Sequence, residues 1–145
     1  MLIFASCKPS QDNFESLPGI NIAADKINTS IKLIDPPEFL NSHKNGEALS
    51  FQIINLSNTT IVFPENYGVK LFANLNGEWT EVSNNSYNGG STFYLPIKEA
   101  YPLGLVVGTL PYIPDLTAPI SIRAIIIGQK ENEQVGAYID VMITP

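Results

Sequence analysis

Apolar and polar residues alternate one for one along several stretches of this chain, and this pattern constrains the fold more than any other feature. The alternation runs through residues 27–33, 49–53, 120–126 and 135–143. Because successive side chains of a β-strand point to opposite faces, each stretch predicts a strand with one buried and one solvated face. Shorter apolar runs at 60–63, 69–75, 78–82, 92–95 and 103–110 predict further strands.

No stretch of ten or more residues carries the period of an amphipathic helix. A parallel sheet needs helical crossovers between its strands, whereas an antiparallel sheet can be joined by short turns. The turns here are rich in Pro, Gly and Asn. The sequence therefore predicts an all-β fold, a two-sheet antiparallel β-sandwich of about seven to nine strands.

Two hairpins are specific enough to predict their pairing. Asn76-Gly77 lies between two strand-like runs, and this dipeptide favours a two-residue turn because both positions take positive φ. Counting outward predicts three pairs: Leu75 with Glu78, Asn74 with Trp79, and Leu71 with Val82. Near the C-terminus we expect a polar loop at 129–134 and a register that pairs Ile127 with Gly136. That register sets Arg123 opposite Asp140 as an outward-facing ion pair, a structural role.

Composition limits the partners. The 145 residues favour a single domain, and one cysteine forms no intramolecular disulfide. Eight basic against fourteen acidic residues give a net charge of −6 with no basic cluster, so we expect no nucleic-acid partner. No apolar run approaches the roughly 20 residues of a membrane-spanning helix.

Three segments are expected: a signal remnant at 1–7, a flexible linker at 8–26 with a short strand near 20–22, and the sandwich at 27–145.

The single cysteine carries the clearest motif. Phe4-Ala5-Ser6-Cys7 resembles the lipobox of bacterial lipoproteins, which implies that the Cys7 thiol is acylated and holds the domain on a membrane outside the cytoplasm. The export signal is incomplete as written, because only six residues precede Cys7 and none is Lys or Arg. The alternative is a free thiol near the N-terminus.

Over residues 27–145 the strand pattern resembles the immunoglobulin-like domains of bacterial surface lipoproteins. The runs 51–57 and 61–63, with Leu71 and Gly77-Glu78-Trp79, also look distantly like bacterial proteinase inhibitors of the BsuPI type. Neither resemblance brings paired cysteines of the antibody type, because the chain has only one cysteine.

The residues offer little chemistry. His43 is the only histidine and lies in a polar segment, so neither a catalytic triad nor a histidine-rich zinc site can be assembled around it. No phosphate-binding or dinucleotide motif is present. The carboxylates and amide at 131–133 leave calcium as a minor alternative. We expect no enzymatic activity, no catalytic residues, no metal and no cofactor.

Aromatic side chains are the best candidates for ligand binding. Trp79, Tyr87 and Tyr94 lie near strand ends and loops, where rings can stack on sugars or anchor a partner. For Trp79 the alternative is a place in the core. The sequence thus predicts a non-enzymatic, lipid-anchored extracytoplasmic binding or accessory domain with a protein or glycan partner. The alternatives are a carbohydrate-binding module, or a protease inhibitor that presents the loop at 84–91.

Overall fold

The computed structural model describes residues 17–36, 42–64, 69–84, 92–99, 105–109 and 111–145. These residues form nine strands and one short 3₁₀ helix, η2 (Ala24–Lys26). In chain order the strands are β1 (Ile31–Ile34), β2 (Leu49–Asn55), β3 (Ile61–Phe63), β4 (Lys70–Leu75), β5 (Glu78–Val82), β6 (Phe93–Leu95), β7 (Leu105–Thr109), β8 (Ile120–Lys130) and β9 (Glu133–Ile143).

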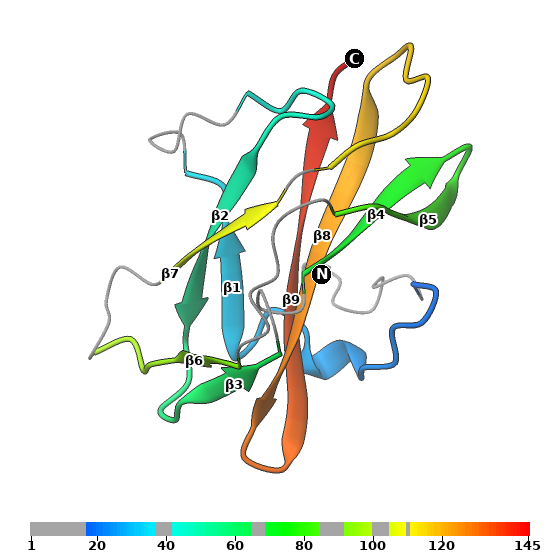
Figure 1. Cartoon of the computed structure of the whole chain (residues 1–145). Helices are drawn as coiled ribbons and strands as arrows, with labels where there is room; N and C mark the ends of the chain where they lie inside the picture. Colours follow the sequence, from blue (N-terminus) through cyan, green and yellow to red (C-terminus); the bar gives the residue numbers. More distant parts are fainter. Residues whose placement is uncertain (1–16, 37–41, 65–68, 85–91, 100–104, 110) are drawn as a thin grey trace, which may run out of the picture.

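The strands form two antiparallel sheets. The smaller sheet has the order β1-β2-β7, and the larger has the order β5-β4-β8-β3-β6 with β9 on the other side of β8. Figure 1 shows β1, β2 and β7 to one side of the long β8 and β9 strands. The predicted all-β, two-sheet sandwich of antiparallel strands is confirmed, and the nine strands of the described residues lie at the upper end of the expected range.

β8 and β9 form the longest hairpin in the described part of the chain. Each strand has 11 residues, and the predicted pairing of Ile127 with Gly136 is confirmed. The loop expected at 129–134 is wrong, because pairing continues to Lys130 and Glu133. Only Glu131 and Asn132 remain in the turn, and Glu131 has a φ of 55°. A two-residue turn with positive φ matches the twist of the strands, so polar residues pair up to the tip.

The β4–β5 hairpin has the predicted register. Its three expected pairs are all present, from Leu75 with Glu78 out to Leu71 with Val82. Asn76 and Gly77 have φ values of 54° and 87°, as the tight turn requires. The side chain of Asn74 caps this turn by accepting a 3.0 Å hydrogen bond from the Gly77 amide.

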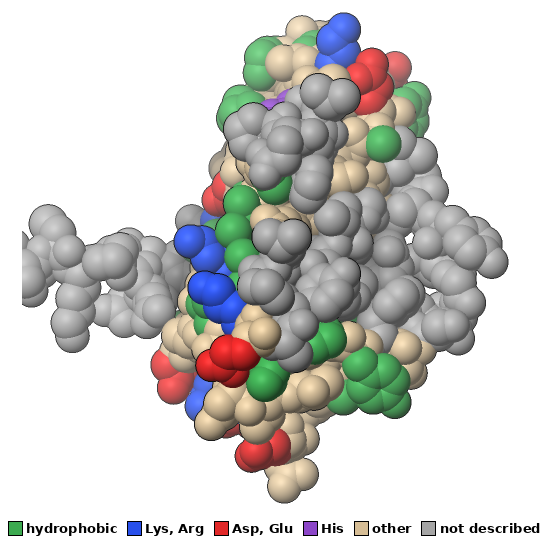
Figure 2. Space-filling model, turned by 90° about the vertical axis from the view of Figure 1, so that its left-hand side faces the viewer, with side chains coloured by type: hydrophobic (Ala, Val, Ile, Leu, Met, Phe, Trp, Pro, Cys, Tyr) green, Lys and Arg blue, Asp and Glu red, His purple; other side chains and the backbone are tan. Residues whose placement is uncertain are grey.

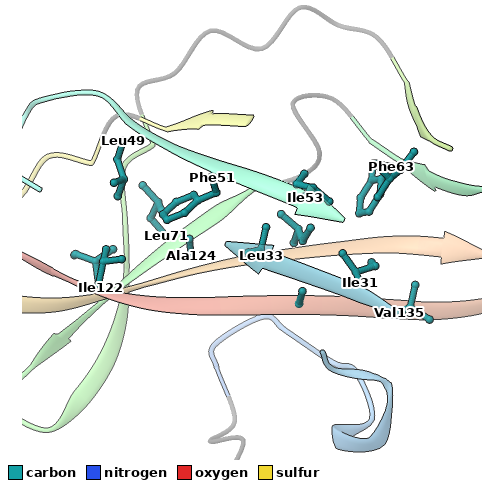
Figure 3. Close-up of a cluster of buried hydrophobic side chains, with 14 of the residues drawn as sticks. Ile31, Leu33, Leu49, Phe51, Ile53, Phe63, Leu71, Ile122, Ala124 and Val135 are labelled. Atoms are coloured by element: carbon teal, nitrogen blue, oxygen red, sulfur yellow. The ribbon is translucent and has the colours of Figure 1, made fainter. Parts of the chain in front are cut away.

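The main core lies between the two sheets. The smaller sheet contributes Leu33 and Phe51, and the larger contributes Phe63, Leu71 and Ile122. Figure 3 shows the side chains of β2 directed toward those of β4 and β8 across this space. Phe51, Phe63 and Leu71 are at most 1% exposed. The apolar positions of the alternating strands therefore point into this core.

A second apolar layer covers the outer face of the larger sheet. We call residues 17–27 the N-terminal strap. Its Leu17 and Ile27 are buried against Phe72 of β4 and Ile125 of β8. The blue segment of Figure 1 lies on the side of β8 and β9 away from the smaller sheet. Residues 8–16 of the expected linker lie outside the described residues, whereas residues 17–26 pack against the domain.

The strap ends in main-chain pairing with β9. Ile27 forms a parallel bridge with Gly136, and the Asn28 amide donates a 2.8 Å hydrogen bond to the Gly136 carbonyl. The Tyr138 amide in turn donates to Asn28 Oδ1 at 3.0 Å. The strand expected from residue 27 therefore starts later: the chain first pairs with β9 and joins the smaller sheet only at Ile31. No strand forms at residues 20–22.

Candidate functional site

A notch in the larger sheet defines the candidate site. On one edge of β8, β4 pairs as far as Ile125 and β3 pairs only at Gln129. Ile127 lies between these two positions, without a strand partner on this edge among the described residues. β4 and β3 therefore diverge on the same side of β8 and leave a space between them.

A groove of about 560 Å³ fills this notch on the outer face of the sheet. Its apolar walls include Ile20 of the strap, Val62 of β3, and Ile125 and Ile127 of β8. Val62, Ile125 and Ile127 share one face of the sheet, because Val62 lies opposite Gln129, which follows Ile127 and Ile125 at steps of two along β8. Small-molecule sites typically have volumes of about 300–1,000 Å³ and mainly apolar linings. The groove has both properties.

The rim of the groove is polar. Lys70 is the only charged residue among the described residues that line it, and Thr92, Gln129 and Gln134 add hydroxyl and amide groups. Lys70 Nζ lies 4.0 Å from Glu81 Oε1, and both side chains are about half exposed. Such a solvated pair contributes little binding between its members, so the ammonium group stays available to a ligand.

Beside the groove, Arg123 is held in a stack of rings. Its guanidinium makes two hydrogen bonds to the Asp140 carboxylate, of 2.8 and 2.9 Å. The guanidinium carbon lies 4.4 Å from the centre of the Trp79 ring and 4.3 Å from that of Tyr138. The predicted ion pair is confirmed. It links β5, β8 and β9 on the outer face, because an arginine can stack on rings while two of its nitrogens, here Nε and Nη2, bind a carboxylate.

The two aromatic candidates among the described residues do not come together. Trp79 is half-buried and already stacked on Arg123, whereas Tyr94 is 62% exposed. They lie on β5 and β6, at opposite ends of the strand order. Tyr94 pairs with Val62 and so shares the outer face with the groove. Tyr87 and Cys7 lie outside the described residues.

The contacts of His43 join two parts of the fold. Its Nε2 lies 2.7 Å from Asp35 Oδ2, and its main-chain carbonyl accepts a hydrogen bond from the Thr144 amide. Glu133, in the segment considered for calcium, pairs instead with Lys26 and Lys130. Within the described ranges, no three His, Cys, Asp or Glu side chains gather where they could hold a metal ion.

The charged surface has no dominant sign on the face that Figure 2 presents. Acidic and basic side chains are interspersed along one edge of that face. In the described part of the chain, no helix has the length and apolar content needed to cross a bilayer.

Comparison with known proteins adds no assignment. A scan against protein-family models found no match, and searches of curated proteins and of solved structures found none either. The candidate site therefore depends on the geometry of this chain alone.

The groove residues were not predicted from the sequence. A signal was present in Ala124-Ile125-Ile126-Ile127, where the alternation gives way to four consecutive apolar residues. Such a run indicates a strand with apolar surroundings on both faces. The inward residues Ala124 and Ile126 belong to the main core, while Ile125 is buried under the strap and Ile127 lines the groove.

Proposed function

We propose that this chain is a non-enzymatic binding or accessory domain, held on the outer side of a cell membrane by lipid on Cys7. The observation that supports binding is the apolar groove on the outer face of the larger sheet, where Lys70 is the one cationic residue of the described lining. Ligand sites are commonly concave and apolar, with a few polar groups that orient the ligand. The groove is therefore the proposed binding surface.

The sequence around Cys7 supports the membrane anchor. Cys7 follows the lipobox-like residues Phe4-Ala5-Ser6. Leu17, the first described residue, is ten positions farther along, so an extended chain between them spans at most about 36 Å. A lipid on Cys7 would hold the domain close to the membrane surface. A protein that carries two lipid chains is attached stably to a membrane, whereas a single acyl chain gives only weak membrane binding.

Metabolic labelling tests the anchor. The gene, with its native upstream DNA, is expressed in the source cells with an alkyne-bearing palmitate, and the protein is recovered from the membrane fraction. We expect label on the native chain and none on Cys7→Ser. Equal labelling of the two chains, or recovery of the unlabelled native chain from the cytosol, would show that Cys7 is not the anchor.

Methyl-resolved NMR tests the groove as the binding surface. A library of small molecules, glycans and peptides is titrated into the protein with labelled isoleucine methyl groups. We expect a ligand to shift Ile125 and Ile127, with Ile31 in β1 of the smaller sheet as the internal control. Shifts confined to residues away from the groove would place binding elsewhere.

A carbohydrate-binding module is the second candidate. The exposed ring of Tyr94 supports it, because an exposed aromatic face can stack on a sugar. This function predicts that Tyr94→Ala abolishes retention on a glycan resin that retains the native domain. Trp79→Ala would then have less effect, since the Trp79 ring is already stacked on Arg123.

A further inference from the structure

We propose that the groove binds small amphiphilic carboxylates, with an aliphatic chain along the partly exposed Val62 and Ile127 and the carboxylate at Lys70. This inference rests on the proposed binding function of the groove and names its ligand class. It follows from three properties of the described lining: an apolar interior, one cation on the rim, and limited size.

The apolar interior selects the body of the ligand. Ile20, Val62, Ile125 and Ile127 present only aliphatic side chains, and the described lining contains no aromatic ring apart from Phe63. Burial of apolar area stabilises a complex by about 25 cal/mol per Å² before the costs of association. A flexible aliphatic chain can follow such a surface, whereas a sugar would leave its hydroxyl groups without partners there.

The rim selects the head group. Lys70 is the only charged residue in the described lining, and its β4 position places it on the same face as Ile125, its partner in β8. A carboxylate at the ammonium group would form a charge-assisted hydrogen bond, stronger than one between neutral groups. The carboxylate of Glu81, 4.0 Å from Lys70 Nζ, disfavours a second anionic group and so favours ligands of a single negative charge.

The dimensions and the notch limit the ligand to a small molecule. A volume of about 560 Å³ accommodates a drug-sized ligand. The space is bounded by β3 and β4, which both pair with β8, so it cannot lengthen along the strand without breaking pairs at Gln129 or Ile125. A medium-length fatty acid fits these limits.

The test compares three amphiphiles that share a ten-carbon chain, each kept below its micelle concentration or solubility limit. Decanoate, decanol and decyltrimethylammonium are titrated into the native chain at neutral pH, and binding is followed by calorimetry and by the Ile125 and Ile127 methyl signals. We expect decanoate to bind tightest and the cationic amphiphile weakest. Equal affinity for all three would overturn the role of charge, and the absence of any methyl shift with decanoate would overturn the ligand class.

Two variants locate the head group and the chain. Lys70→Gln should weaken decanoate binding about five- to tenfold and leave decanol unchanged. Lys32→Gln, on an exposed position of β1 in the smaller sheet, is the matched control and should change neither. Ile127→Ala should weaken both ligands. Decanoate affinity that is the same in Lys70→Gln and in the native chain would overturn the proposal.

The outcome also separates this inference from the binding function. If decanoate fails to shift the groove methyl groups while another molecule of the library shifts them, the ligand class is wrong and the groove remains the binding surface. If neither decanoate nor any library member shifts them, both proposals fail.

Discussion

Single asparagine side chains hold the irregular connections of this protein. Asn55, at the end of β2, is 1% exposed and donates hydrogen bonds to the carbonyls of Thr59 and Leu95, at 2.7 and 3.2 Å. Its Oδ1 accepts from the Ser57 amide and hydroxyl. Asn45 acts similarly by exchanging two hydrogen bonds with the main chain of Ile113. An asparagine can do this because it carries both donors and acceptors, which lets it imitate a main-chain partner.

Replacing Asn55 with alanine should destabilise the fold by about 1–3 kcal/mol, because it removes the hydrogen bonds that this buried side chain makes to the Leu95 carbonyl and the Ser57 amide. The measurement is the free energy of unfolding in urea at unchanged m-value. Asn58→Ala, an exposed position in the same turn, is the control and should stay within about 0.5 kcal/mol of the native chain. Equal losses in the two variants would contradict a specific role for Asn55.

One ion pair fastens the strap to β9. Lys26 Nζ lies 3.0 Å from Glu133 Oε2 on the exposed surface. The hydrogen bond and charge of Lys26 lower the pKa of Glu133 below its ordinary value of 4.5. The hydrogen bond and charge of Glu133 raise the pKa of Lys26 above its ordinary value of 10.5. Both directions indicate that the folded chain favours the charged forms.

The pair predicts a pH window. A lowered carboxyl pKa stabilises the fold above pH 4.5, and this contribution is lost as the pH falls through the folded pKa of Glu133. A raised amine pKa stabilises the fold below pH 10.5, and this contribution is lost as the pH rises through the folded pKa of Lys26. Glu133→Gln should therefore be slightly less stable than the native chain at pH 7 and should match it in strong acid. A difference in urea midpoint that persists unchanged at pH 2 would contradict this account.

At the scale of elements, β8 organises the larger sheet. It pairs with β9 along its whole length on one edge and with β4 and then β3 on the other. Its faces contact both the main core and the strap layer, which explains its apolar run at 124–127. Gly128 allows β8 to pack closely against the side chains of β3. An added Cβ there would lie 2.8 Å from Phe63 Cε1 and 2.9 Å from Ile61 Cγ2, both buried.

Gly128→Ala should destabilise the fold by about 1–3 kcal/mol, because the added methyl group overpacks the contact between β8 and β3. Phe63→Leu should relieve part of this cost in the double variant. A double-mutant cycle measured by urea unfolding should show the double variant to be more stable than the sum of the two changes predicts, by at least about 0.5 kcal/mol. Simple additivity would mean that Phe63 is not the obstacle.

At the scale of the whole molecule, the larger sheet has apolar side chains on both faces. The smaller sheet covers one face and the N-terminal strap covers part of the other. The part at the notch between β3 and β4, which the described residues leave open, is the proposed binding groove. The strap contributes Gly19 and Ile20 to this groove, so the same segment completes the fold and forms a wall of the site.

Leu17→Ala tests whether the strap folds with the sandwich. Leu17 is 2% exposed, so its truncation should lower the free energy of unfolding by about 2–5 kcal/mol if the strap and sheets unfold together. Leu56→Ala, at a position 45% exposed, is the control and should have little effect. An unchanged global transition with faster amide exchange confined to residues 17–27 would instead show that the strap opens alone.

Local patterns in the sequence were sufficient for the hairpins. The Asn76-Gly77 turn set the β4–β5 register, and the alternation in the last two strands set the pairing of Arg123 with Asp140. These predictions succeeded because a hairpin is defined by residues close in sequence and by a period of two, both of which are visible in one chain. The prediction of a polar loop at 129–134 was wrong, because hydrophilic composition does not reveal that two strands continue to pair.

The sequence by itself determined the fold class, the period of each strand and the tight turns, since these depend on local backbone preferences and on which side chains avoid water. Tertiary structure alone decided that Leu17 and Ile27 cover the outer face and that Trp79 stacks on Arg123. It also decided that β3 and β4 diverge to leave the groove. Such contacts join residues far apart in the chain, and apolarity alone does not specify which partner will bury a given side chain.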